Sequence, residues 1–354
     1  MPGLTANLLR TSIPITRLRM VCLCVMASVA CAGLFFSFSG ASFAKEQDIP
    51  DPASNVVELK FAWPVGLAGT ATTDSLRIQR RGDKAVTFEV TDETSFTLES
   101  ADRGLLLRFS GIRMNTRITP ESPGQQGELQ KLFQVLSAMQ PSYIVSPQGK
   151  LVDVAGLDKF RESILAQLDK YGSSLLKTAR PRVKALVMKQ FSRDELLALI
   201  SADWNRLVGH WVGAALRLGA TYQVNSSSPR IPLLGNITLP GQYVFGATRR
   251  VPCGDTGTAV KCVELHMTSQ LDPGKTAAAL RKYTREAAKQ TGAGVDRIKS
   301  VRMKFDLILV TEPSTLIPHD TTSVTRTVVT TIDSDGRRST SYDTRSVTVH
   351  YHYK

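Results

Sequence analysis

The chain has 354 residues, of which 42% are hydrophobic, and a formal net charge of +13 at pH 7. This apolar share is normal for a folded protein, and it excludes wholesale disorder, a collagen-like chain and a protein with many membrane-spanning helices. The length alone allows two or three domains, whereas the order of the predicted elements favours a single one.

The first 44 residues predict a secretory signal peptide. Three arginines and no acidic residue form a basic start, and an apolar run follows from Met20 to Phe38. The small residues Ser42 and Ala44 then precede a polar segment that contains prolines, which is typical of a cleavage site near Ala44. The alternative is an uncleaved helix that anchors the protein, since the apolar run approaches the ~20 residues that a membrane helix needs. We expect residues 45–354 to form the mature protein, either periplasmic or secreted.

The predicted mature chain keeps two of the five cysteines, Cys253 and Cys262. They flank a short loop between two strand-like stretches, Tyr243–Val251 and Val260–Met267. An even number of cysteines in an oxidising compartment predicts a disulfide. It would close a loop of about ten residues and contribute somewhat less than ~3 kcal/mol to stability. The alternative, two ligands of a metal site, lacks a second Cys or His pair nearby in the sequence.

The mature chain begins with strand patterns separated by short polar or glycine-containing turns. In Ala85–Val90, for example, apolar and polar residues alternate with the period of a half-buried strand. The predicted strands are Val56–Trp63, Thr70–Gln79, Ala85–Val90, Ser95–Glu99 and Leu105–Met114.

Four helical patterns follow, with apolar residues at intervals of three and four that predict faces packed on a sheet. The first covers Glu128–Gln140, and a small hairpin of Tyr143–Ser146 with Lys150–Val154 comes after it. The second begins near Leu157, and the third follows Pro181. The fourth runs to Trp211 and has the residues of a capping box at its start, Ser192 and Glu195.

The remainder of the chain predicts strands again, with one helix among them. Asp272 and Pro273 are typical of a helix start, and that helix should end near Thr291. The Asp335-Gly336 pair predicts the turn of a long hairpin. The predicted strands outside the cysteine pair are Thr221–Val224, Ile237–Leu239, Val301–Val310, Ser323–Ile332 and Arg338–Tyr351.

This order predicts a single α+β domain with strands in 56–114, helices in 128–212, and strands plus one helix in 220–352. The N- and C-terminal strands should form one large, curved antiparallel sheet, covered on one face by four to five helices. At the level of architecture alone, the order of strands, helices and strands is similar to that of lipid carriers of the bacterial periplasm.

The catalytic motifs are incomplete. Gly274-Lys275-Thr276 lacks the glycine-rich loop that a phosphate-binding motif needs. Ser174 and Lys177 match the Ser-x-x-Lys pattern of penicillin-recognising enzymes, but the companion motifs are absent. His319, His350 and His352 are candidate metal ligands, because imidazoles at i and i+2 on a strand share a face. The sequence predicts no cofactor.

Basic residues gather in two regions and favour an anionic partner such as lipid headgroups or another anionic component of the cell envelope. Solvated helix faces are the alternative interpretation. We expect no nucleic-acid partner, since no RNA-binding motif appears and the destination is outside the cytoplasm. The candidate residues for an anionic surface are Lys177, Arg180, Arg182, Lys184, Lys189, Arg281, Lys282, Arg285 and Lys289.

These features favour an exported, non-catalytic protein that meets the export machinery through its signal and then binds an apolar or anionic ligand of the envelope, such as lipid. One alternative is an extracytoplasmic hydrolase or metal-dependent enzyme, whose groups would be His319, Asp320, His350 and His352 brought together, or Ser174 with Lys177. Another is a structural or assembly protein of the envelope, whose terminal hairpin pairs with another chain.

Overall fold

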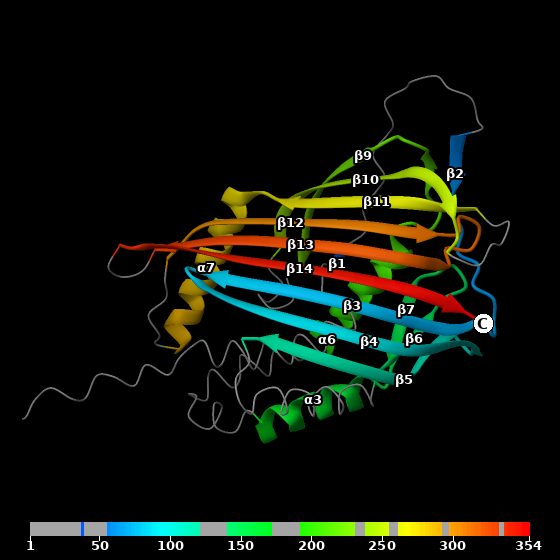
Figure 1. The fold of residues 1–354 in the computed structure, drawn as a ribbon, viewed down its shortest axis with the longest axis horizontal. Helices are drawn as coiled ribbons and strands as arrows, with labels where there is room; N and C mark the ends of the chain where they lie inside the picture. The colour runs from blue at the N-terminus through cyan, green and yellow to red at the C-terminus, as the bar shows by residue number, and fades with distance from the viewer. Residues whose placement is uncertain are drawn as a thin grey trace, which may run out of the picture.

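The structure is a computed structural model. It describes residues 37–38, 55–120, 140–171, 192–230, 238–254, 261–291, 297–332 and 336–354 (Figure 1). The remaining residues lie outside the described part of the chain. They include all of the predicted signal peptide except Ser37–Phe38, the helical pattern Glu128–Gln140 up to its last residue, and the pattern after Pro181.

One antiparallel sheet of 12 strands dominates these residues, in the order β1-β9-β10-β11-β12-β13-β14-β3-β4-β5-β6-β7. Two short strands, β2 (Val56–Glu58) and β8 (Ala215–Arg217), form a second sheet. The strands of the large sheet are β1 (Ser37–Phe38), β3 (Ala68–Arg81), β4 (Lys84–Ala101), β5 (Gly104–Thr119), β6 (Ser142–Val145), β7 (Leu151–Ala155), β9 (Tyr222–Arg230), β10 (Thr238–Pro252), β11 (Lys261–Leu271), β12 (Arg297–Thr311), β13 (Pro318–Ile332) and β14 (Arg338–Tyr353).

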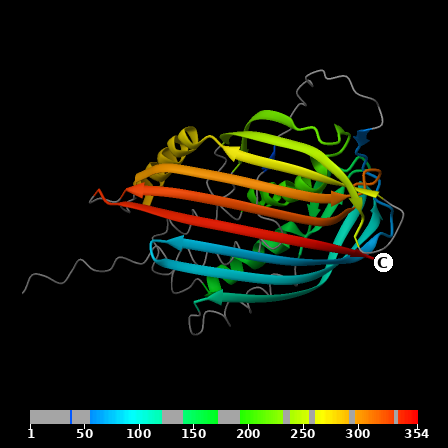
Figure 2. The same ribbon diagram turned by 45° about the horizontal axis from the view of Figure 1, so that its top comes forward.

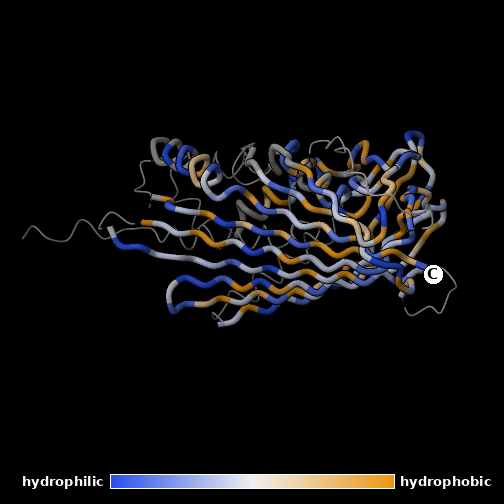
Figure 3. The backbone as a smooth tube through the Cα atoms, turned by 90° about the horizontal axis from the view of Figure 1, so that it is seen from above, coloured by the Kyte–Doolittle hydropathy of each residue, from blue (hydrophilic) through white to orange (hydrophobic). Residues whose placement is uncertain are grey.

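The centre of the sheet joins the two ends of the sequence, because β14 pairs with β3 along thirteen residue pairs from Ser341↔Arg81 to Tyr353↔Gly69. Figures 1 and 2 show β14 and β3 side by side in the middle of the long strands. The predicted sheet of N- and C-terminal strands is therefore present. Apolar and polar residues alternate along many of the long strands (Figure 3), as expected for strands with one buried face.

Three α-helices occur in the described residues: α3 (Leu157–Tyr171), α6 (Arg193–Trp204) and α7 (Pro273–Thr291). A π-helical segment, Asn205–Gly209, continues α6. Local capping explains where two of them begin. Ser192 Oγ accepts a hydrogen bond from the Glu195 amide at 3.3 Å, and Asp272 Oδ1 accepts one from the Lys275 amide at 2.9 Å. Both starts match the sequence predictions.

Side chains of α6 and the π-helical segment hold this helix against one face of the sheet, which we call the inner face. The Trp204 indole donates a hydrogen bond to the Gly149 carbonyl at 2.7 Å, in the turn between β6 and β7. Trp204, Val208 and Trp211 are buried in the same cluster as apolar residues of β11 and β12. The hydrophobic core thus lies between α6 and the inner face.

The predicted α+β fold with four to five covering helices is wrong, because the described chain is mostly β-structure with three helices. The strands are longer than predicted. Polar stretches that were interpreted as turns continue as strand, so Ala85–Val90 and Ser95–Glu99 are parts of the single strand β4. The helix α7 packs near one end of the sheet, against β12 and β10. It leaves most of the length of the sheet uncovered (Figure 1).

Candidate functional site

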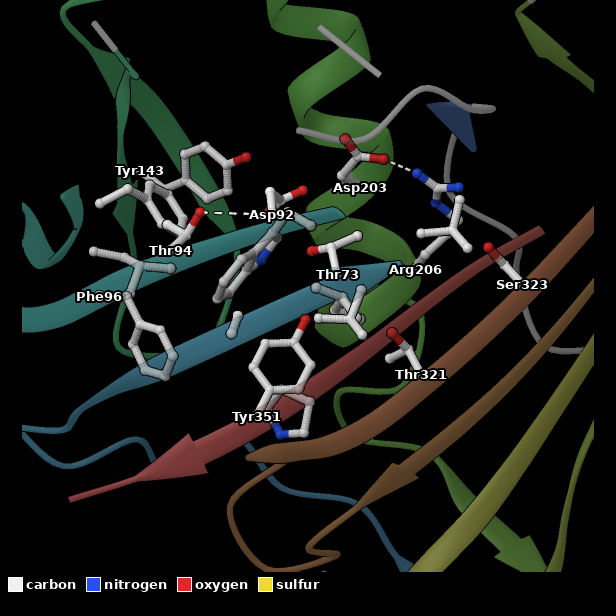
Figure 4. Close-up of a pocket in the computed structure, with 18 of the residues that line it drawn as sticks. Thr73, Asp92, Thr94, Phe96, Tyr143, Asp203, Arg206, Thr321, Ser323 and Tyr351 are labelled. Atoms are coloured by element: carbon white, nitrogen blue, oxygen red, sulfur yellow. Dashed lines mark hydrogen bonds and ion pairs between the residues drawn. The ribbon is translucent and has the colours of Figure 1, made fainter. Parts of the chain in front are cut away.

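A cavity of about 210 Å³ lies between the inner face of the sheet and α6 (Figure 4). Its strand residues come from β3, β4, β5, β6, β12, β13 and β14, and Trp63 lines it from the segment after β2. Aromatic and aliphatic side chains form much of the lining, among them Trp63, Phe96, Leu107, Phe109, Trp204 and Leu307. Such a surface suits the apolar part of a ligand.

Aromatic rings cluster at the end of the cavity where β14 finishes. The Phe96 ring lies edge-on to Tyr351 and Tyr353, with centroid distances of 6.3 and 5.8 Å. The Trp63 and Trp204 rings meet in the same way at 5.4 Å. Burial raises the pKa of the Tyr351 hydroxyl, so it stays protonated and can donate a hydrogen bond at neutral pH.

A polar row crosses the sheet beside these rings. Cross-strand pairing aligns Asp92 of β4 with Thr73 of β3, Thr73 with Val349 of β14, and Val349 with Thr321 of β13. Because directly paired residues point to the same side of a sheet, these four side chains face the cavity together. Figure 4 shows Asp92, Thr73 and Thr321 arranged in this way.

Asp92 is the carboxylate of this row, and its side chain is nearly inaccessible, with the residue 7% exposed. Its Oδ1 accepts a hydrogen bond from Thr94 Oγ1 at 3.4 Å, whereas its Oδ2 has no hydrogen-bond partner among the described residues. Burial raises the pKa of Asp92 to about 6; hydrogen bonds from Thr73 and Thr94 oppose this, and the Asp74 charge adds to it. A ligand donor or water would satisfy Oδ2.

A bulge in the sheet orients the side chains of Asp92 and Thr94. Between Glu93 and Ser95 the pairing of β4 with β5 shifts, so that Gly111 and Ile112 of β5 lie opposite Thr94 alone. The backbone of Gly111 has φ +62°, a conformation that favours glycine. Such bulges commonly reorient a side chain beside a binding site.

Two buried guanidinium groups supply positive charge. Arg206, in the π-helical segment, forms an ion pair with Asp203, and both side chains are 11% exposed. Burial, together with the smaller effect of the nearby Arg345 charge, lowers the pKa of Arg206 to about 9. Arg345 comes from β14 and is 8% exposed. The repulsion between these two cations means that an anionic group placed near them would be stabilised.

Arg345 and the aromatic rings lie at different depths of the cavity. Arg345 precedes Val349 by four residues on β14, and Val349 is paired with Thr73 in the row of Asp92. At about 3.3 Å per residue the separation along the strand is about 13 Å. The lining therefore runs from aromatic rings, past Asp92 and the threonines, to a basic end.

The sequence-predicted cysteine pair is at disulfide distance. The sulfur atoms of Cys253 and Cys262 are 2.13 Å apart, and the bond joins the end of β10 to β11. Of the residues proposed for an anionic surface, Arg281, Lys282 and Arg285 lie on α7, and Arg281 Nη1 donates to the Ile298 carbonyl of β12 at 3.2 Å. Lys289 belongs to α7 by its backbone. The other candidates, Lys177, Arg180, Arg182, Lys184 and Lys189, lie outside the described residues, as does Ser174.

The candidate metal ligands do not converge. His350 Nδ1 lies 2.6 Å from Asp320 Oδ1, and His350 and His352 are both exposed. His319 lies on β13, as Asp320 does, but the His319 Nε2 is 3.1 Å from Glu312 Oε1. Its ligand atom instead lies within 4.8 Å of those of Cys253 and Cys262. The hydrolase built on His319, Asp320, His350 and His352 together therefore has no geometric support.

The sequence did not single out Asp92, Thr94 or Arg345. The period of two along a strand is a usable signal. Asp92 and Thr94 fall on the same face of β4 as the apolar residues Val90, Phe96 and Leu98, and all five residues are buried. A carboxylate on the apolar side of an alternating pattern is a candidate for function, since burial of a charge is costly. The polar letters of residues 91–94 had instead indicated a turn.

No helix in the described ranges is both long and apolar enough to cross a membrane. No protein-family model matches the chain, and a search of curated proteins finds no match.

A search of solved structures finds remote similarities, among them the following two. A structure of lipid-protein interactions in lipovitellin aligns with a TM-score of 0.34 and 10% identity, covering 82% of this chain and 25% of that one. This chain thus spans about a quarter of the lipovitellin chain it matches. An outer membrane channel from Pseudomonas putida F1 aligns with a TM-score of 0.21 and 7% identity over 86% of this chain and 100% of that chain. At these scores neither similarity says what the present chain binds.

Proposed function

We propose that this chain is an exported protein of the cell envelope whose mature part, residues 45–354, is one domain that binds an amphipathic ligand with an anionic head, such as a fatty acid. The observation that carries the proposal is the cavity under α6, with rings at one end and buried Arg345 at the other. Its lining offers a place for both parts of such a molecule.

The location rests on two independent features. The sequence before Lys45 has the basic, apolar and small-residue regions of a secretory signal. The disulfide between Cys253 and Cys262 is of a kind that persists in oxidising compartments and is rare in the cytosol. Mass spectrometry of the N-terminus of the mature protein tests the proposed cleavage after Ala44, and an intact N-terminus would favour the uncleaved anchor.

The ligand would lie along the strands. Its apolar part would contact Phe96, Phe109 and Trp204, which removes apolar surface from water at about 25 cal/mol per Å². Its anionic head would lie near Arg345 and reduce the repulsion between that guanidinium and Arg206. A hydroxyl or water between the two ends would donate to Asp92 Oδ2.

The direct test is to purify the mature protein without detergent, extract it with organic solvent and identify bound molecules by lipid mass spectrometry. We expect a molecule with an acyl chain and an acidic head at a substantial fraction of one per chain. Clean, lipid-free protein that also fails to take up a fluorescent fatty acid would overturn the proposal.

A matched pair of variants separates the cavity from the outer face. Thr73→Phe places a ring in the cavity, whereas Thr72→Phe places one on the opposite face, across from exposed His350. We expect Thr73→Phe to reduce uptake of the fluorescent fatty acid at least about tenfold and Thr72→Phe to leave it unchanged. Circular dichroism of each variant establishes that it is folded, and equal uptake by two folded variants would contradict the proposed position.

A second pair tests the charge. Arg345→Met keeps the length of the side chain but removes the cation, and Arg326→Met does the same at an exposed residue that pairs with Asp306 at 3.1 Å. We expect Arg345→Met to weaken binding of a fatty acid about tenfold or more and to leave binding of the corresponding uncharged alcohol unchanged. Arg326→Met should alter neither.

A further inference from the structure

Three possible metal ligands meet at one end of the sheet, outside the cavity wall described above. Cys253 directly follows β10, Cys262 lies on β11, and His319 lies on β13. Their ligand atoms all lie within 4.8 Å of one another. Both cysteines are buried, and the His319 side chain is 10% exposed. With the disulfide formed, the two sulfurs are bonded to each other and neither is a thiolate.

The orientation of His319 suits coordination through Nδ1. Its Nε2 is 3.1 Å from Glu312 Oε1, so this nitrogen can donate to the carboxylate. The other nitrogen faces the cysteine loop, since a Cβ on Gly254, the residue after Cys253, would lie 3.7 Å from His319 Nδ1. A carboxylate that accepts from the far nitrogen of a ligating imidazole is the usual support of a histidine metal ligand.

Neighbouring contacts hold this histidine and its carboxylate in place. Glu312 Oε2 accepts a hydrogen bond from Thr315 Oγ1 at 2.8 Å. The His319 ring packs edge-on against Tyr353, with centroids 5.4 Å apart. Thr311 Oγ1 donates to the Ile317 carbonyl at 2.9 Å and closes the loop between β12 and β13. The imidazole therefore has a fixed position independent of the disulfide.

We propose that reduction of the Cys253–Cys262 disulfide opens a binding site for one thiophilic cation of the Zn²⁺ or Cu⁺ class, with Cys253, Cys262 and His319 as ligands. Two sulfurs and one imidazole form a donor set that favours these cations over Mg²⁺ or Ca²⁺. Glu312 positions His319 from behind. The site exists in the reduced chain, which includes the newly exported chain before oxidation, and disappears when the disulfide forms.

Reduction of the disulfide and binding of the cation are two separate steps. A reductant of the dithiol class transfers two electrons and two protons to the disulfide by thiol–disulfide exchange, and itself leaves as a cyclic disulfide. The S–S bond of this chain breaks and two thiols form. Binding of the cation then displaces the two thiol protons, so that two thiolates and the neutral imidazole coordinate it.

The test uses the full mature chain in two redox states. One sample is left oxidised, and the other is reduced with a dithiol that is then removed without oxygen. Both are incubated with Zn²⁺, desalted and analysed for metal. We expect about one Zn²⁺ per reduced chain and almost none per oxidised chain. Equal zinc content in the two states would overturn the proposal.

Variants identify the ligands. In the reduced state His319→Gln should weaken Zn²⁺ binding at least about tenfold, and Glu312→Gln about ten- to a hundredfold. His350→Gln is the matched control, because that histidine is exposed and paired with Asp320, and it should bind as the unaltered chain does. Co²⁺ gives a second readout, since thiolate-to-cobalt absorption in the near ultraviolet should appear and be lost in Cys262→Ser. Wild-type affinity in His319→Gln would overturn the proposed ligand set.

If reduction unfolds the chain, folding itself becomes the measurement. Zn²⁺ should then restore the circular dichroism of the reduced unaltered chain and of His350→Gln, but not that of His319→Gln. A failure of zinc to restore the unaltered chain would also overturn the proposal. Fatty-acid binding by the oxidised protein is measured separately and does not depend on either result.

Discussion

Two regions of the same inner face are equally buried but chemically opposite. The first, here called the apolar wall, consists of inward residues of β11 and β12: Val263, Leu265, Met267, Phe305 and Leu309. The second, the polar wall, consists of inward residues of β3, β4 and β13: Thr73, Ser75, Asp92, Thr94, Thr321 and Thr325. Leu309 is 0% exposed, and Thr73 and Thr321 are each 6% exposed.

One row of cross-strand pairs passes through both walls. It runs from Asp92 through Thr73, Val349 and Thr321 to Leu309 and Leu265. The antiparallel strand pairing continues along this row while the side chains change from polar to apolar. The apolar wall contributes stability through burial, whereas the polar wall lines a cavity and keeps a carboxylate with an unsatisfied oxygen. Such local departures from stable packing are expected at functional sites.

The largest expected effect tests the apolar wall. Leu309→Ala should lower the free energy of unfolding by about 4 kcal/mol, within the usual range for a buried leucine, because it removes apolar contacts and leaves a void. Urea denaturation followed by circular dichroism measures this. Ile308→Ala, at the adjacent residue that is 42% exposed on the outer face, should change stability by no more than about 0.5 kcal/mol. Similar losses in both would mean that Leu309 is not part of a packed core.

The second effect has the opposite sign and belongs to the polar wall. The pKa of Asp92 is raised from 3.8 to about 6, so the folded chain binds this proton more tightly than the unfolded chain. Stability from this group therefore increases as pH falls through about 6, and the gain is complete below about 4. Two pKa units correspond to about 3 kcal/mol. We expect Asp92→Asn to be more stable than the unaltered chain by about this much at pH 7, and nearly equal to it at pH 4.

The measurement is the difference in unfolding free energy between the two proteins from pH 7 to pH 4. Burial lowers the pKa of His210 to about 4, and this destabilises the fold as pH falls from about 6.5, but it acts equally in both proteins and cancels in the difference. Glu93→Gln, at the next and exposed residue, serves as control. A difference between Asp92→Asn and the unaltered chain that does not vary with pH would show that Asp92 is not a buried carboxylate.

The smallest effect concerns the hydroxyl that supports this carboxylate. Thr94→Val preserves the shape of the side chain and removes the donor to Asp92 Oδ1, so it should cost about 1 kcal/mol at pH 7. In the unaltered chain the hydrogen bond from Thr94 lowers the pKa of Asp92. Its removal should therefore raise that pKa, and with it the pH at which the Asp92 contribution appears. Thr97→Val, at an exposed residue of β4, should do neither. Equal pH midpoints in the two variants would argue against the hydrogen bond.

The sequence predicted the large antiparallel sheet and several element boundaries well where local chemistry decides them. The cap at Ser192 and the Asp272-Pro273 helix start are local, and the structure has helices beginning at Arg193 and Pro273. The strand lengths were wrong, because polar residues within long strands were interpreted as turns, and Ala85–Val90 and Ser95–Glu99 are parts of the single strand β4. In β4 the partner strands, rather than local preference, keep residues 91–94 extended.

The candidate site was largely beyond sequence reasoning for the same physical reason. Asp92, Arg345 and Arg206 come from β4, β14 and the segment after α6, and only the cross-strand register places them around one cavity. His319 and the cysteines are likewise far apart in sequence, and strand pairing brings them within reach of one another. The cysteine pair itself was foreseeable, because its members are nine residues apart.

The pairing of β14 with β3 has a consequence for how the molecule must be assembled. Arg77 and Asp343, whose side chains are hydrogen-bonded across this pair, are 266 residues apart in the chain. Contacts of such long range form late in folding, because the intervening chain must first be brought together. Until β14 is in place, β3 and β13 each present an unpaired edge, which is a template for association with other chains. Any factor that delays the pairing of β14 therefore leaves the edges of β3 and β13 open to association with other chains.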